Sequence, residues 1–109
     1  MDLKTLIGYK VLYNRSMFSP LGLNGMVEYK INEWVSPNKD CGPLCVFNNI
    51  QDAINFMGES FDSFRIYECL YEPSEEKHIY FGLKEIGKSL YRLPKGTVLA
   101  SRVKLISMY

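Results

Sequence analysis

The sequence has little histidine, tryptophan or cysteine, with one His, one Trp and three Cys among 109 residues. An odd number of cysteines excludes a disulfide framework that uses all of them within the chain, and reduced thiols are typical of intracellular proteins. No run approaches the roughly 18 apolar residues that a transmembrane helix needs. The N-terminus also lacks the basic, apolar and small-residue order of a signal peptide. We therefore expect a soluble, cytoplasmic protein with no membrane partner.

What is present is the composition of a folded domain. Apolar residues make up 47% of the chain and charged residues 23%, a balance that allows a packed core and argues against disorder. A chain of this length supports one core, so we expect a single globular domain over residues 1–109. Its net charge of +1 alone predicts no polyanionic partner.

Basic residues nevertheless gather from Lys77 onward, where Glu85 is the only acid. They are Lys77, Lys84, Lys88, Arg92, Lys95, Arg102 and Lys104. They have two interpretations: a basic face for nucleic acid, or basic strands that lie beside acidic ones. We favour the second because paired strands favour opposite charges.

Local patterns predict several strands and one helix. Residues 7–14, 27–31, 44–47, 63–72 and 97–109 are rich in β-branched and aromatic residues, and 77–83 is most simply a hairpin partner of 63–72. Residues 49–57 have an apolar stripe with helical spacing, a cap at Asn48 and a terminal Gly58. The expected fold is α+β, a twisted and mostly antiparallel sheet of about six strands with one main α-helix at residues 49–57.

The cysteines and the histidine raise two chemical alternatives, a metal site and a catalytic thiol. Cys41, Cys45, Cys69 and His78 include the residue types of a zinc site, and His78 is a possible base for a cysteine nucleophile. The first two cysteines, however, are separated by three residues, and Cys45 lies inside a predicted buried strand. Buried cysteines that act as small apolar residues are the simpler interpretation. We therefore expect no metal, no cofactor and no catalytic residues.

Aromatic and polar residues suggest a binding site instead. Rings that stack on a ligand and a few polar groups that orient it are typical of small-molecule sites. The predicted ligand-binding residues are Tyr9, Arg15, Ser16, Trp34, Phe47 and Tyr67. Core packing is the alternative for each ring, least so for Trp34, which lies between a predicted turn at Asn32 and the Ser-Pro of the next loop.

The stretches "YKVLYNRS", "GPLCVFNNIQDAINFM" and "RIYECLY" together resemble the split-sheet core of ADP-ribosyltransferase-like domains. The chain is also similar to small prokaryotic and viral domains of unassigned activity that share Gly-Pro-Leu-x-Val-Phe and a closing "LPxGTVLAxxV". The first resemblance implies an enzyme acting on NAD through Arg15, Ser16 and a late carboxylate. Glu85 is the only late candidate, because residues 96–109 contain neither Glu nor Asp, so the catalytic signature is incomplete.

The sequence therefore predicts a non-enzymatic binding domain for a small anionic or nucleotide-like ligand, or for a protein partner. One alternative is an ADP-ribosyltransferase-like enzyme. The other is a nucleic-acid-binding protein that uses Lys84, Lys88, Arg92, Lys95, Arg102 and Lys104.

Overall fold

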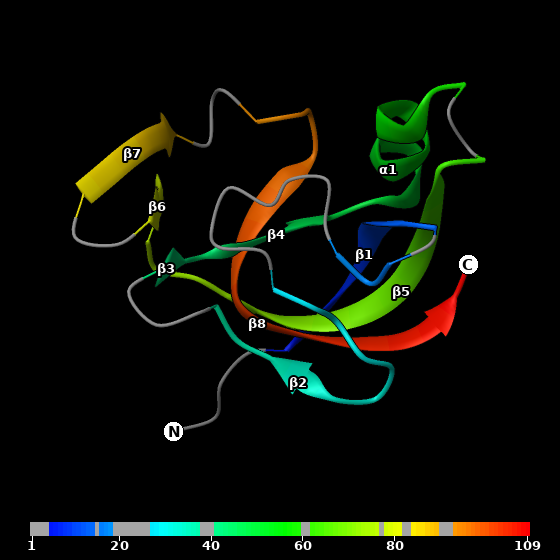
Figure 1. Ribbon diagram of the computed structural model, residues 1–109, viewed down its shortest axis with the longest axis horizontal. Coiled ribbons are helices and arrows are strands. Elements are labelled where there is room, and N and C mark those ends of the chain that lie inside the picture. Colours follow the sequence, from blue (N-terminus) through cyan, green and yellow to red (C-terminus); the bar gives the residue numbers. More distant parts are fainter. Residues whose placement is uncertain are drawn as a thin grey trace.

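The computed structural model describes residues 5–14, 16–18, 27–37, 41–59, 62–76, 78–81, 84–89 and 93–109, of which 41–42, 78–81 and 84–89 are described for the backbone only. The elements, shown in Figure 1, are β1 (Leu6–Tyr13), β2 (Trp34–Val35), β3 (Cys41–Gly42), β4 (Leu44–Phe47), α1 (Ile50–Met57), β5 (Phe64–Pro73), β6 (His78–Phe81), β7 (Lys84–Ser89) and β8 (Thr97–Met108). Among these residues no helix has the length and apolar character needed to cross a bilayer.

The main sheet closes on itself. Its order is β2-β8-β4-β1-β5, and an additional pairing between β5 and β8 joins the ends into a small barrel of β8, β4, β1 and β5, with β2 attached to β8. Closure depends on β8, which pairs with β4 near its start and with β5 along its length. The β5–β8 register shifts between Glu68 and Cys69 and between Glu72 and Pro73, and such bulges bend and twist strands.

The expected α+β character and antiparallel pairing are therefore found, but the expected twisted sheet of about six strands is wrong, because four strands close into a barrel with one more attached. The pairing expected for residues 77–83 is also wrong. The backbone of β6 pairs with β3 and β7 in a separate three-stranded sheet, while β5 pairs with β1 and β8. We expected a hairpin because the two segments are close in the sequence. β5 instead pairs with β1 and β8, which are longer than β6 and lie farther away in the sequence.

The helix forms where its stripe predicts, at Ile50–Met57. Its cap is Asn49 rather than Asn48, because the Asn49 side chain accepts a hydrogen bond from the backbone N–H of Asp52 at 2.8 Å. Gly58 has the expected positive φ, 56°, and its N–H donates to Ile54. The helix contacts β1, β4 and β5, and so covers one part of the barrel's outer surface.

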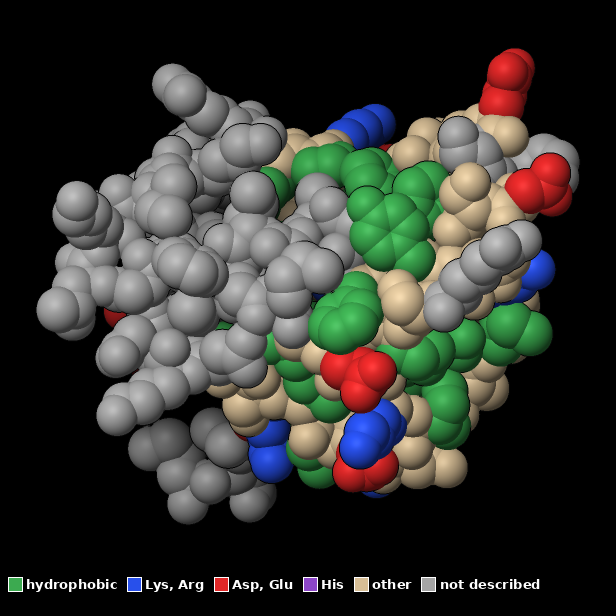
Figure 2. Space-filling model, viewed as in Figure 1, with side chains coloured by type: hydrophobic (Ala, Val, Ile, Leu, Met, Phe, Trp, Pro, Cys, Tyr) green, Lys and Arg blue, Asp and Glu red, His purple; other side chains and the backbone are tan. Residues whose placement is uncertain are grey.

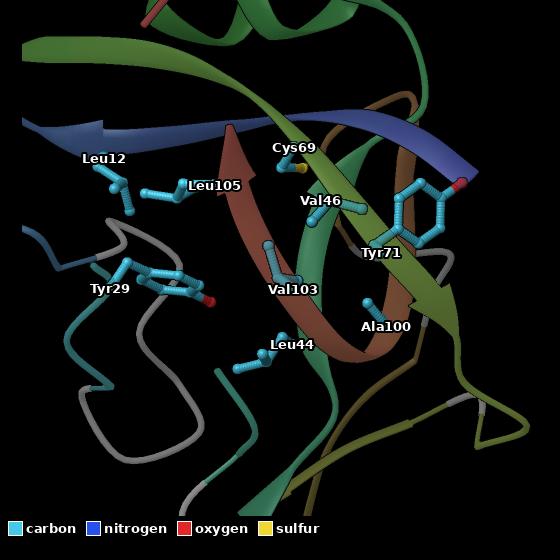
Figure 3. Packing of buried hydrophobic residues seen from close by; sticks show 9 residues of the cluster. All are labelled: Leu12, Tyr29, Leu44, Val46, Cys69, Tyr71, Ala100, Val103 and Leu105. Carbon is cyan, nitrogen blue, oxygen red and sulfur yellow. The ribbon is translucent and has the colours of Figure 1, made fainter. Parts of the chain in front are cut away.

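Two apolar clusters lie on opposite sides of the barrel wall. The first fills the interior and consists of Leu12, Tyr29, Leu44, Val46, Cys69, Tyr71, Ala100, Val103 and Leu105, which point toward one another in Figure 3. The second lies beneath α1 and consists of Val11, Phe47, Ala53 and Ile66. Successive residues of β1 and β5 alternate between the two clusters, as the two-residue period of a strand requires.

Candidate functional site

The outer surface that α1 leaves uncovered carries a row of side chains across four strands. Trp34 on β2 is the partner of Lys104 on β8, Lys104 of Leu70 on β5, and Leu70 of Ile7 on β1. Their sequence neighbours Leu6, Val35, Tyr71 and Val103 pack in the barrel interior. The row therefore faces outward, and Ile7, with 59% of its surface exposed, is the most open position. We call these four residues the outer row.

Local sequence places Trp34 on this surface. Asn32 has φ 64°, a value that asparagine tolerates, and its N–H donates to the carbonyl of Leu105 at 2.8 Å. The turn expected at Asn32 is therefore confirmed. It directs residues 34–35 along β8, so that the Val35 side chain faces the interior and that of Trp34 faces out.

Arg102, beside the outer row, is held by two neighbours. Its Nη2 donates to Oε2 of Glu72 at 2.7 Å, and its Cζ lies 4.2 Å from the centroid of the Trp34 ring. The Glu72 side chain is 8% exposed and that of Arg102 39%. The hydrogen bond to Glu72 raises the pKa of Arg102, which keeps the guanidinium charged. Ring and carboxylate together fix the orientation of an arginine that still reaches solvent. We call Trp34, Glu72 and Arg102 the arginine clamp.

The ion pair of the arginine clamp is relevant to the two interpretations of the basic residues in the sequence. Arg102 and Glu72 are register partners on β8 and β5, so at this position a basic strand lies beside an acidic one as expected. On the face shown in Figure 2, Lys and Arg side chains among the coloured residues are scattered between Asp and Glu rather than gathered. A polyanion favours a continuous basic surface, and the described residues of this face do not form one.

The barrel interior holds a lysine that sequence reasoning missed. Lys10 is 2% exposed, its Nζ donates to the Cys45 carbonyl, and it lies 5.0 Å from the centroid of the Tyr29 ring. Burial lowers the pKa of Lys10 to about 8. The signal for its burial was its position, two residues before Leu12. Residues two apart on a strand share a face, and the inward residues of β1 fill the core. Lysine is almost never fully buried unless paired, so a surface position was the natural expectation.

Burial also determines the state of the two described thiols. It raises the pKa of Cys45, and it raises that of Cys69 to about 12. Both thiols therefore stay protonated at neutral pH, and a protonated thiol is a poor nucleophile and metal ligand. Among the residues with described side chains, no group of three His, Cys, Asp or Glu is placed to hold a metal ion. The side chains of Cys41 and His78 lie outside the described set.

Described residues line two open hollows, of which the smaller lies beside α1. One has a volume of about 220 Å³ and is lined by Asp52, Asn55, Phe56, Pro94 and Lys95. The other has a volume of about 340 Å³ and is lined by Tyr13, Asn14, Asp62 and Ser63. No residue of the outer row or of the arginine clamp lines either hollow.

The structure separates the predicted ligand-binding residues. Phe47 is 2% exposed and packs beneath α1 with Tyr9, whereas Tyr67 packs against the interior cluster on the other side of the wall. Trp34 is on the outer row, and Ser16 is half-buried in the segment after β1. Ligand binding at these residues stays a prediction, and the described ones do not meet in one cleft.

Two predicted residues fall outside what is described. Arg15 is not described, and Glu85 is described for the backbone of β7 only. The ADP-ribosyltransferase-like alternative, which needs both side chains, stays a prediction. No known family model, curated protein or solved structure matches the chain.

Proposed function

We propose that this domain binds a protein partner through the outer row and the arginine clamp. The observation that carries the proposal is the fixed orientation of Arg102, between the Trp34 ring and the Glu72 carboxylate, on a surface that also exposes Ile7. Arg and aromatic residues are enriched among the side chains that dominate binding energy at interfaces. An arginine whose side chain is ordered before binding loses less conformational entropy when a partner docks.

The shape of the surface favours a protein over a small molecule. Small ligands bind in concave sites that bury most of their surface. The two described hollows lie away from the outer row. The described lining of the larger one includes Asp62 and no Lys or Arg, which disfavours an anionic ligand there. A sheet face on which Ile7, Leu70 and Trp34 lie among charged residues offers instead the mixed surface that protein interfaces use.

The test compares capture of partners by the wild-type domain and by surface variants. Ile7→Asp and Arg102→Ala each change one exposed side chain of the proposed interface, and Lys95→Ala changes the smaller hollow as a control. Removal of an interface hot spot costs about 2 kcal/mol, so both variants should bind a captured protein about 30-fold more weakly. The control should bind as the wild type does. Equal binding by all variants would refute the assignment of this surface.

A small anionic ligand remains the second candidate, and one observation favours it. Only one hydrogen bond joins the Arg102 guanidinium to any described residue, and a guanidinium has five N–H donors. Trp34 is the single tryptophan, so its fluorescence reports on the clamp directly. Quenching by NAD or ADP-ribose that saturates, and that is lost in Arg102→Ala, would support a nucleotide-like ligand. A flat titration would leave the protein partner as the better supported function.

A further inference from the structure

The larger hollow lies where the end of β1 meets the turn that leads into β5. The backbone N–H of Asn14 donates to the Ser63 carbonyl at 2.8 Å, and its side-chain amide donates to the Asp62 carbonyl at 3.1 Å. Two segments far apart in the sequence are thereby held together at the rim. The backbone of the two segments and the Asn14 amide therefore have fixed relative positions.

Tyr13 supplies an aromatic surface to this hollow. Its ring lies 5.4 Å from that of Phe64 at an interplanar angle of 31°, and the two residues are partners across β1 and β5. Tyr13 is nevertheless 41% exposed. The ring is thus supported by Phe64, which packs against the cluster beneath α1, while much of Tyr13 faces solvent, as in an aromatic platform that stacks on a ligand.

The polar lining consists of hydrogen-bond acceptors and a hydroxyl. Asp62 contributes a carboxylate and Ser63 a hydroxyl group, and both residues are exposed. Asn14 uses an N–H of its amide on the Asp62 carbonyl, which leaves its side-chain oxygen to accept from a ligand. Among the lining residues that the structure describes there is neither Lys nor Arg, so at these residues an anionic ligand would meet the Asp62 carboxylate without a compensating charge.

From this combination we propose that the hollow binds one pyranose ring of a neutral sugar. The C–H face of a pyranose packs on an aromatic ring, and its hydroxyl groups donate to carboxylate and amide oxygens. The volume of about 340 Å³ lies at the small end of the range for ligand sites, large enough for one hexose and too small for an extended chain. This site shares no residue with the outer row or the arginine clamp and does not depend on the proposed function.

The experiment follows backbone amide signals of the whole domain by NMR while methyl glycosides of glucose, galactose and mannose are added. A single open sugar site should bind with a Kd on the order of 1–10 mM, so additions up to about 50 mM suffice. The expected result is saturable shifts at residues 13–14 and 62–64 with at least one glycoside. Shifts that do not saturate, or that fall elsewhere on the domain, would overturn the proposal.

Three variants separate the contributions. Tyr13→Phe keeps the ring and should retain binding. Tyr13→Ala removes the ring and Asp62→Asn removes the charged acceptor, and each should raise Kd about fivefold or more. If Tyr13→Ala does not fold, Asp62→Asn decides the question, because an exposed carboxylate can be replaced without loss of structure. Choline serves as the cationic probe, and saturable binding of choline without binding of any glycoside would overturn the sugar assignment.

Discussion

Replacement of Lys10 by methionine should make the folded domain more stable at neutral pH. The amine is fully buried, and burial lowers its pKa from 10.5 to about 8. Each tenfold change in an acid constant corresponds to about 1.4 kcal/mol, so the charged form costs about 3 kcal/mol on folding. Methionine has a similar length and no charge. It loses the hydrogen bond to the Cys45 carbonyl, worth about 1 kcal/mol, so the expected net gain for Lys10→Met is about 2 kcal/mol.

The same reasoning predicts how this difference varies with pH. Because the pKa of Lys10 is lower in the folded state, between about pH 8 and 10.5 the unfolded state binds more protons, and the Lys10 contribution to stability rises with pH. The advantage of Lys10→Met should therefore be largest below pH 8 and decline by about 3 kcal/mol as pH approaches 10.5. Cys45, Cys69 and Tyr29 have pKa values that burial raises, and they act in the opposite direction in both proteins. The charge of Lys10 lowers the pKa of the two thiols, so Lys10→Met should raise both further.

The assay is urea unfolding of both proteins, followed by Trp34 fluorescence across this pH range. The exposed Lys30 provides a matched control, because Lys30→Met removes a charge from the surface rather than from the core. The free energy of unfolding of that variant should differ from that of the wild type by less than about 0.5 kcal/mol at each pH. If the difference in the free energy of unfolding between wild type and Lys10→Met stays constant with pH, the assignment of a charged amine in the barrel interior is refuted.

Other local features give sharp expectations for stability. Gly8→Ala should destabilise the domain by about 1–3 kcal/mol, because a Cβ there would lie 2.8 Å from the Tyr71 ring; urea unfolding unchanged by the substitution would contradict this packing. Asn49→Ala should cost about 1 kcal/mol in thermal unfolding, since it removes the acceptor for the Asp52 N–H. Gln51→Ala, on the exposed face of the same helix, should stay within about 0.5 kcal/mol, and an equal loss in both would contradict the cap at Asn49.

Features set by neighbouring residues were predictable. The helix at residues 50–57, its terminal Gly58 and the turn at Asn32 each follow from a few adjacent side chains and their backbone preferences. The two-residue period of a strand likewise places Cys69 and Tyr71 on one face of β5 and Phe64 and Ile66 on the other, as the two clusters show. The shift of the cap from Asn48 to Asn49 shows the limit of such signals where two adjacent residues have the same capacity.

The candidate sites were less predictable, because they consist of contacts between distant segments. Trp34 was identified from its loop context, but its stacking on Arg102 requires β2 to lie along β8. The larger hollow joins the end of β1 to the turn before β5, nearly fifty residues later, through Asn14. No local pattern specifies which turn a strand end will meet.

The sequence by itself determined the helix, the longer strands, the two alternating faces of β5 and the absence of a long apolar segment, because these depend on composition and on short periodicities. The strand expected at residues 27–31 was wrong, since that segment forms only isolated bridges, at Glu28 and Ile31. Only the tertiary structure decided that β5 and β8 pair to close the barrel and that β6 pairs elsewhere. It also decided that Lys10 is enclosed and that Arg102 is oriented by Glu72 and Trp34. Strand pairing is selected by the burial of complete apolar faces across the whole chain, and that competition is not visible in any one segment.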